Sequence, residues 1–427
     1  MRTAIPTAPF LAPFLALALA LASTLACGGG SGSGSSSTAA AAAAITSFSA
    51  AQPNLAPGQS TTLTAVFSGG AGTVDQGVGA VTSGAPVTVS PGGTTTYTLT
   101  VSGGTALTAT TTVTVGSQVV TYANLSGADL GAGAGLNGAI PFPHDNPWNT
   151  DISAAPVDPN SANLIASIGK GTGLHPDFGS GPWDGALIGI PYMVVPGTQA
   201  KVPVSFQYSD QSDPGPYPIP ADVPIEGQPV AGGSFGGDRH VLVLDRDHNL
   251  LYELYAAYPQ ADGSWQAGSG AVFHLDSDDV RPTALPGWTS ADAAGLPIFA
   301  GLARYDEAAG AAGIRHALRF TVAATREAYV PPATHWASSD TSANLPPMGM
   351  RVRLKATYAI PTSFSAPTQA LLQAMKTYGM LVADNGSDWF VSGAPDPRWD
   401  NDALVSELSQ VKGSDFEVVQ MEGLVTP

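Results

Sequence analysis

Cysteine and positive charge are both scarce in this chain. Its 427 residues include one cysteine, Cys27, which excludes an internal disulfide framework. Charged residues make up 11% of the chain, well below the roughly 25% of an ordinary soluble protein. The 16 Lys and Arg face 33 Asp and Glu, for a net charge of −17. An acidic surface repels phosphate backbones, so we expect no nucleic-acid partner.

Three metal or nucleotide signatures are also missing. The chain has no HExxH pair of zinc ligands and no GxxxxGK[ST] phosphate loop. The acidic run at 276–279 lacks the glycine and the distal glutamate of a calcium-binding EF-hand loop. Any chemistry must therefore be inferred from scattered polar residues.

The first residues are typical of an export signal. Arg2 gives a positive start, 10–22 is apolar, and small residues continue to Ala26. The apolar run is shorter than the roughly 20 residues that span a membrane. We therefore predict a signal peptide at 1–26.

Cys27 follows at once, in the run Thr-Leu-Ala-Cys-Gly. This run resembles a bacterial lipobox, which implies a lipid on Cys27 and anchoring at the cell surface or outer membrane. Cleavage after Ala26 with free secretion, or an uncleaved anchor, are the alternatives. The Ser/Gly/Ala-rich segment 27–44 cannot bury enough apolar surface to fold, so we expect a flexible tether. Membrane contact would then be through the lipid only.

The next segment, 45–115, alternates threonine with apolar residues. Strands are expected at 60–67, 95–101 and 107–115, with Gly and Pro turns between them. Short strands spaced this closely favour a β-sandwich. Matches at 45–50, 74–81 and 94–101, with Tyr97 at a tyrosine-corner position, resemble bacterial surface immunoglobulin-like domains. The resemblance implies a stalk without catalysis.

Composition changes after a second Gly/Ala-rich segment, 116–138, which we interpret as a linker. All seven His and all seven Trp lie in 139–427, which we expect to be a large, β-rich mixed α+β domain in a mainly β protein. It resembles exported bacterial proteins, which implies export and no particular activity. Expected strands are 192–195, 202–208, 240–245, 250–255, 271–275, 314–322 and 350–357. Expected helices are 161–168, 290–294, 366–378 (capped by Ser365 and Gly379) and 400–408.

Asp238, Arg239 and His240 open an apolar strand after Gly-Gly. Polar residues where a loop enters a strand are frequent site positions, so Asp238 and His240 are catalytic candidates and Arg239 a substrate-binding one. The alternative is an Asp–Arg pair capping a turn. Glu253 interrupts the next apolar strand and is a candidate general acid if buried; the alternative is an exposed edge.

Two loops pair tryptophan with a polar partner. Trp288 precedes Asp292, a catalytic candidate that could equally stabilise a short helix capped by Ser290. His335, another catalytic candidate, is followed by Trp336. Tryptophan rings stack on sugars, so Trp288 and Trp336 are substrate-binding candidates.

Two further Asp–Trp clusters lie near the C-terminus. Asp384 precedes Trp389, and Trp399 precedes Asp400. We expect Asp384, Trp389 and Trp399 to line a substrate groove, although a hairpin turn and a helix cap explain the aspartates too.

These features together favour a polysaccharide-active enzyme, a glycoside hydrolase or lyase held on a stalk, acting on a polysaccharide or cell-surface glycan. One alternative is a non-enzymatic surface lipoprotein that binds a glycan or another partner. A second is a metal-dependent hydrolase with His240, His316 and His335 as ligands of a divalent ion. His316 shares a strand face with apolar residues, which favours a core position.

Overall fold

The computed structural model describes residues 43–427, apart from 56–58, 104–105, 117–119, 231–235, 283–287 and 311. The expected signal peptide, the lipid-bearing Cys27 and nearly all of the tether lie outside the described residues. Among the helices that are described, none is long and apolar enough to cross a membrane. The protein is mainly β, as the sequence predicts.

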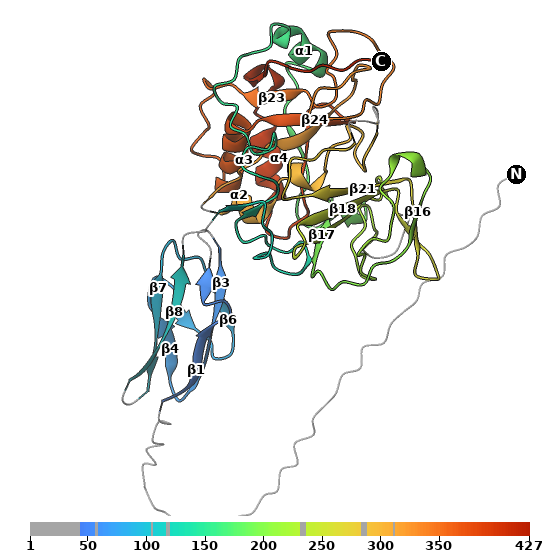
Figure 1. The fold of residues 1–427 in the computed structure, drawn as a ribbon. Coiled ribbons are helices and arrows are strands. Elements are labelled where there is room, and N and C mark those ends of the chain that lie inside the picture. Colours follow the sequence, from blue (N-terminus) through green and yellow to red (C-terminus); the bar gives the residue numbers. More distant parts are fainter. Residues whose placement is uncertain are drawn as a thin grey trace, which may run out of the picture. The chain divides into compact units, whose positions relative to one another are not determined.

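The N-terminal part is a sandwich of two sheets, drawn in blue in Figure 1. Its apolar positions point inward on alternate residues, and Tyr97 and Leu99 are buried between the sheets. The three expected strands are present within a residue or so of their predicted bounds. The first sheet holds β1 (Ala44–Ala50), β3 (Thr61–Ser68) and β6 (Pro86–Val89). The second holds β2 (Asn54–Leu55), β8 (Leu107–Val115), β7 (Thr95–Ser102), β4 (Ala71–Val74) and β5 (Gly79–Val81).

The C-terminal part is built on two larger sheets that share one core. The five-stranded sheet runs β10 (Gly131–Ala132), β15 (Tyr192–Val195), β17 (Val241–Asp245), β18 (Leu250–Tyr255) and β21 (Ser269–His274). The six-stranded sheet runs β12 (His175–Asp177), β25 (Phe390–Ser392), β22 (Leu318–Val322), β24 (Met380–Asn385), β23 (Arg351–Leu354) and β26 (Phe416–Val418).

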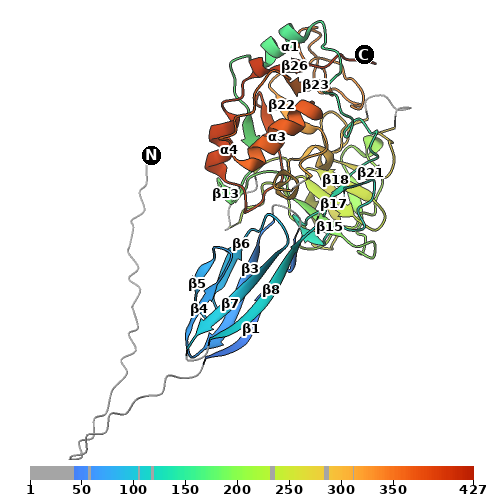
Figure 2. The ribbon, with the colours of Figure 1, turned by 90° about the vertical axis from the view of Figure 1, so that its left-hand side faces the viewer.

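Helices and small sheets complete this part. Figure 2 shows α3 beside α4, and α3 packs on β23 of the six-stranded sheet. The helices are α1 (Ser161–Ile168), α2 (Tyr305–Ala308), α3 (Ala366–Thr377) and α4 (Asn401–Leu408), with 3₁₀ turns at Ser209–Gln211, Phe299–Gly301 and Gly413–Asp415. The small sheets pair β9 (Thr121–Tyr122) with β11 (Ala139–Ile140), β13 (Pro182–Trp183) with β14 (Ala186–Leu187), and β16 (Val204–Phe206) and β19 (Tyr258–Pro259) with β20 (Trp265–Ala267).

Helix caps made the longer helices predictable. The Ser365 hydroxyl accepts a hydrogen bond from the Thr368 N–H at the start of α3, and the Asp400 carboxylate caps α4 in the same way. The helix predicted at 290–294 is wrong: Ser290 does bind the Asp292 N–H, but the segment forms turns.

The segment 116–138 is not the linker that its Gly/Ala content predicts. Leu125 and Leu136 are fully buried in the core of the C-terminal part, and β10 pairs with β15. The burial of these leucines and the pairing of one strand hold the segment in the fold, although its composition is typical of a flexible chain. The described residues of this segment from 120 onward therefore belong to the C-terminal fold.

Candidate functional site

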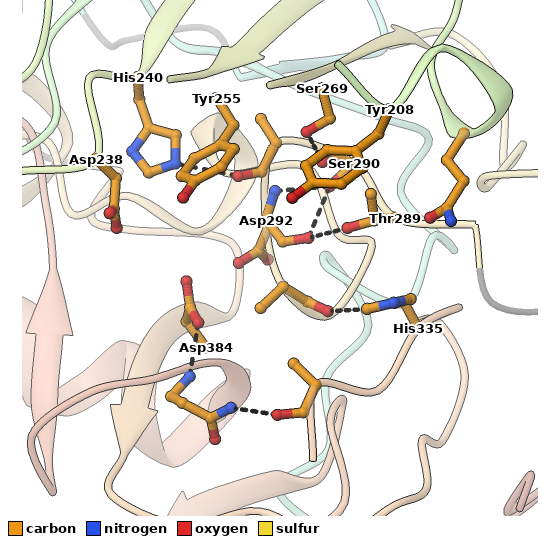
Figure 3. A pocket seen from close by; sticks show the side chains of 15 residues that line it. Tyr208, Asp238, His240, Tyr255, Ser269, Thr289, Ser290, Asp292, His335 and Asp384 are labelled. Atoms are coloured by element: carbon orange, nitrogen blue, oxygen red, sulfur yellow. Dashed lines mark hydrogen bonds between the residues drawn. The ribbon is translucent and has the colours of Figure 1, made fainter. Parts of the chain in front are cut away.

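A cavity of about 600 Å³ lies in the C-terminal part and collects most of the expected catalytic residues. Asp238, His240, Asp292, His335 and Asp384 all line it, although they are distant in sequence (Figure 3). The remaining lining residues are Tyr208, Gln211, Tyr255, Ser269, Thr289, Ser290, Ala291, Ala293, Ala337 and Asn385.

Strand register brings one wall of the cavity together. In the antiparallel pair β17–β18, Val241 lies opposite Leu254, which sets the preceding His240 opposite Tyr255. Their rings are 5.9 Å apart. Tyr255 in turn lies opposite Ser269 on β21. One row across the end of the sheet therefore supplies three side chains to the cavity.

The loop that carries Asp292 is held from both sides. The Ser269 hydroxyl donates to the Ser290 carbonyl at 2.8 Å, and the Ser290 hydroxyl accepts from the Asp292 N–H at 2.9 Å. The Ala294 N–H donates to the Ala383 carbonyl of β24 at 3.0 Å. These bonds fix the Asp292 backbone between the two large sheets.

A β-bulge places Asp384. In the β22–β24 pair Phe320 lies opposite Val382, but Thr321 lies opposite Asp384, so Ala383 is an extra residue. Bulges redirect the side chains that follow them and are frequent beside active sites. Asp384 and the following Asn385 both reach the cavity from the end of this strand.

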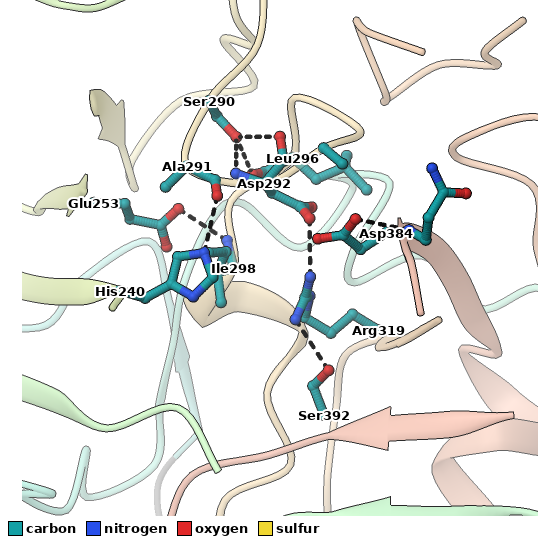
Figure 4. A network of polar contacts seen from close by, with 12 residues as sticks. His240, Glu253, Ser290, Ala291, Asp292, Leu296, Ile298, Arg319, Asp384 and Ser392 are labelled. Carbon is teal, nitrogen blue, oxygen red and sulfur yellow. Dashed lines mark hydrogen bonds and ion pairs between the residues drawn. The ribbon is translucent and has the colours of Figure 1, made fainter. Parts of the chain in front are cut away.

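Asp292 and Asp384 form a carboxyl pair beside Arg319. Figure 4 shows the two carboxyl groups pointing toward each other. Arg319, buried on β22, donates from Nη2 to Asp292 Oδ1 at 2.8 Å and from Nη1 to the Ser392 hydroxyl at 3.0 Å. Asp292 Oδ2 is buried and has no hydrogen-bond partner among the described residues. A buried carboxyl oxygen without a partner is costly, and the cost is lower when the carboxyl group is protonated.

Burial and repulsion set the protonation of this pair. Burial raises the pKa of Asp292 to about 7, which Arg319 opposes and the nearby Asp384 carboxylate reinforces. Burial also raises the pKa of Asp384, and Arg319 again opposes the shift. Two close carboxyl groups ionise in sequence, so the pair gives up its last proton at a higher pH than an isolated aspartate does.

His240 is a fixed cation. Its Nδ1 lies 2.6 Å from Glu226 Oε2 and its Nε2 lies 3.0 Å from the Ala291 carbonyl oxygen. Both neighbours are acceptors, so the doubly protonated ring satisfies both. Burial lowers the pKa of His240, but the Glu226 carboxylate outweighs it and raises the pKa to about 9. We expected proton transfer from His240; the geometry gives it a positioning role, because it holds the Ala291 carbonyl next to Asp292.

Glu253 does not reach the cavity. Its side chain is fully buried, which contradicts the exposed-edge interpretation and meets the condition set for a general acid, but it is not among the lining residues. Its two oxygens accept hydrogen bonds from the N–H groups of Ile298 and Phe299, each at 2.9 Å. Glu253 thus satisfies the free N–H groups at the start of a 3₁₀ turn. Burial raises its pKa to about 7, against the effect of these two bonds.

None of the four expected tryptophans lines the cavity. Trp389 is fully buried, stacked on Phe320, and Trp399 is buried against Phe178, so both belong to the core. Burial of such large aromatic rings contributes strongly to the stability of a core.

The half-buried tryptophans and Arg239 are also engaged elsewhere. Trp288 lies under the Arg281 guanidinium, with 5.0 Å to the ring centre, and Trp336 stacks on Tyr329. Arg239, expected to bind substrate, lies over the Tyr258 ring and donates to the Ala257 carbonyl. It does not line the cavity.

The three histidines of the metal-ligand alternative do not form a site. His316 is buried away from the cavity lining, with Nδ1 bonded to the Ala317 carbonyl and Nε2 to Glu307. No group of three or more His, Cys, Asp or Glu in the described part of the chain could hold a metal ion. His335 uses Nδ1 to bond the Ala293 carbonyl at 2.6 Å, and this tautomer leaves Nε2 as an acceptor.

Sequence reasoning missed several residues of the site. Arg319 is the clearest, because an arginine between Leu318 and Phe320 in an apolar strand predicts a buried partner. Glu226 carries a similar but weaker signal after Pro-Ile. Tyr208 and Tyr255 carry none, since tyrosine at a strand end is ordinary.

Comparison of the chain with protein-family models, with curated proteins and with solved structures gives no match. The cavity itself is therefore the basis for a function.

Proposed function

We propose that the C-terminal part is a polysaccharide-active enzyme that cleaves glycosidic bonds with Asp292 and Asp384 as its acid–base pair. The observation that carries the proposal is the buried, unpartnered Oδ2 of Asp292, in the wall of an open cavity and facing a second carboxyl group.

Cleavage of a glycosidic bond needs one protonated carboxyl group and one ionised carboxylate on opposite sides of the bond. Asp292 is the more buried of the two, and because its pKa is raised to about 7 it is still partly protonated at neutral pH. Asp384 is half-buried, and its Oδ1 accepts the Asn385 N–H at 2.7 Å, which favours its ionised form. Arg319 stabilises the negative charge that Asp292 acquires when it gives up the proton.

The cavity also suits sugar rings. Its volume of about 600 Å³ is in the range of small-molecule sites, so a sugar ring with its hydroxyl groups can fit in it. Tyr208 and Tyr255 supply aromatic faces for stacking, the role first expected of tryptophans. Ser269, Thr289, Ser290 and Asn385 supply hydrogen-bonding groups.

A panel of polysaccharides, assayed for new reducing ends, tests the proposal. We expect Asp292→Asn and Asp384→Asn each to lower kcat by about 10²-fold or more. Asp402→Asn, which removes an exposed carboxylate of α4, is the matched control and should keep full activity. If the wild type cleaves no glycan but binds one by calorimetry, the non-enzymatic binding protein becomes the better description.

We further propose that the enzyme acts outside the cell, held by a lipid on Cys27, with the sandwich as its stalk. The lipobox-like run and the spacer after it support this place of action. Cys27→Ala should abolish lipid labelling and release the protein from the membrane fraction. Unchanged membrane association of this variant would refute the lipid anchor and leave the enzyme proposal intact.

A further inference from the structure

The charged residues of the cavity lining are mostly acidic. Its lining holds three aspartates, Asp238, Asp292 and Asp384, against the single cation His240. No Lys or Arg is among the described residues that line it.

Cations near the cavity wall are already committed to protein partners. Arg319 donates to Asp292 and Ser392. Arg281 is buried, pairs with Asp213 and donates to the carbonyls of Thr289 and Gln211. His240 uses both ring nitrogens for Glu226 and Ala291. A substrate carboxylate or sulfate that entered this cavity would meet three aspartates, and each nearby cation already has protein partners.

This distribution of charge bears on the reaction. Cleavage of a uronate polymer by elimination is favoured by a group that neutralises the substrate carboxylate as a proton leaves the adjacent carbon. The described wall of the cavity offers no Lys or Arg for this role, and both ring nitrogens of His240 already have protein partners. Hydrolysis of a sugar without acid groups needs only the carboxyl pair and water.

We infer that the substrate is a glycan free of acid groups, built of uncharged or amine-bearing sugars, and that the enzyme cleaves it by hydrolysis. The inference rests on the proposed function and narrows it. Asp292 gives its proton to the glycosidic oxygen as the bond from that oxygen to the anomeric carbon breaks. Water supplies the hydroxyl group to the anomeric carbon and returns its remaining proton to the carboxyl pair.

A matched pair of substrates tests the charge preference. The glycan cleaved fastest in the panel is compared with the same glycan after oxidation of its primary hydroxyls to carboxylates. Like charges brought together cost several kcal/mol, so we expect kcat/KM to fall on the order of 10²-fold upon oxidation. The products should carry new reducing ends and no unsaturated sugar.

Asp238 gives the sharpest variant, because its side chain is exposed at the cavity and is not part of the carboxyl pair. Asp238→Asn should lower the ratio of kcat/KM for the unoxidised glycan to kcat/KM for the oxidised glycan. Added salt should lower this ratio further, because it screens the remaining charges. Asp402→Asn removes the same charge elsewhere and should leave the preference unchanged. Equal rates on both glycans, or unsaturated products, would overturn the inference while leaving glycan cleavage established.

If the wild type cleaves no glycan in the panel, measurements of glycan binding test the inference instead. Calorimetry with panel oligosaccharides and their oxidised forms should then show binding of the unoxidised forms alone. That result would retain the substrate class and reject catalysis. Equal binding of the oxidised forms, or no binding of either, would reject the substrate class as well.

Discussion

His240 and Ala291 are joined by a hydrogen bond of 3.0 Å between the Nε2 of the ring and the main-chain carbonyl oxygen. The bond links the start of β17 to the loop that carries Asp292, and Glu226 holds the opposite side of the same ring. Because both ring nitrogens are engaged, His240 controls where Asp292 lies without exchanging protons itself.

The first prediction concerns this ring. His240→Ala leaves Glu226 without its buried partner, so we expect the free energy of unfolding to fall by about 3–5 kcal/mol. His274→Ala is the control: it removes an exposed histidine at the end of β21, and a change of no more than about 0.5 kcal/mol is expected. Chemical denaturation measures both. Equally small losses of unfolding free energy in both variants would show that the Glu226–His240 ion pair does not stabilise the fold.

Stability should also depend on pH in a definite direction. The pKa of His240 in the folded protein is about 9, above its ordinary value of 6.5. Its contribution to stability is therefore complete below about pH 6.5 and is lost as pH rises through 9. Melting temperatures recorded from pH 6 to pH 10 should fall across this window in the wild type, and this part of the fall should be absent from folded His240→Ala.

Local sequence signals predicted several of the residues that line the cavity. Asp238 and His240 were singled out at the start of an apolar strand, and Asp292, His335 and Asp384 were singled out beside tryptophans. What could not be found were partners far away in sequence: Glu253 is satisfied by N–H groups some 45 positions on. Trp389 likewise packs on Phe320, a contact that no local pattern encodes.

A second prediction separates the structural role of Glu253 from catalysis. Glu253→Gln turns an amide N–H₂ toward one of two backbone donors, which loses its acceptor at a cost of about 1–3 kcal/mol. Activity per folded molecule should be unchanged, because Glu253 does not line the cavity. The exposed Glu422→Gln is the control for stability. A roughly 100-fold loss of turnover with normal stability would return Glu253 to the catalytic group.

The pKa of Glu253 adds a pH test. Its folded value of about 7 exceeds the ordinary 4.5, so the folded state binds this proton more tightly than the unfolded state. The resulting stability is complete below about pH 4.5 and is lost as pH rises through 7. Between pH 4 and pH 8, the melting temperature of Glu253→Gln should fall less steeply than that of the wild type.

A third prediction tests whether 116–138 belongs to the C-terminal fold. Leu136 is buried and Leu130, in the same Gly/Ala-rich segment, is 48% exposed. Leu136→Ala should lower the free energy of unfolding by about 2–5 kcal/mol, and Leu130→Ala by no more than about 0.5 kcal/mol. If the two variants unfold alike, the segment acts as the linker that its composition predicts.

The last prediction concerns the carboxyl pair. Asp292 must be protonated to act as the acid, and its pKa is about 7, so kcat/KM should fall as pH rises above about 7. Part of that pKa comes from repulsion by Asp384. Asp384→Asn removes this charge, which lowers the pKa of Asp292 and should move the alkaline limb of the residual activity to lower pH. The control Asp402→Asn should leave the limb in place. A limb that stays where it was, or moves to higher pH, would show that Asp292 and Asp384 do not act as a coupled pair.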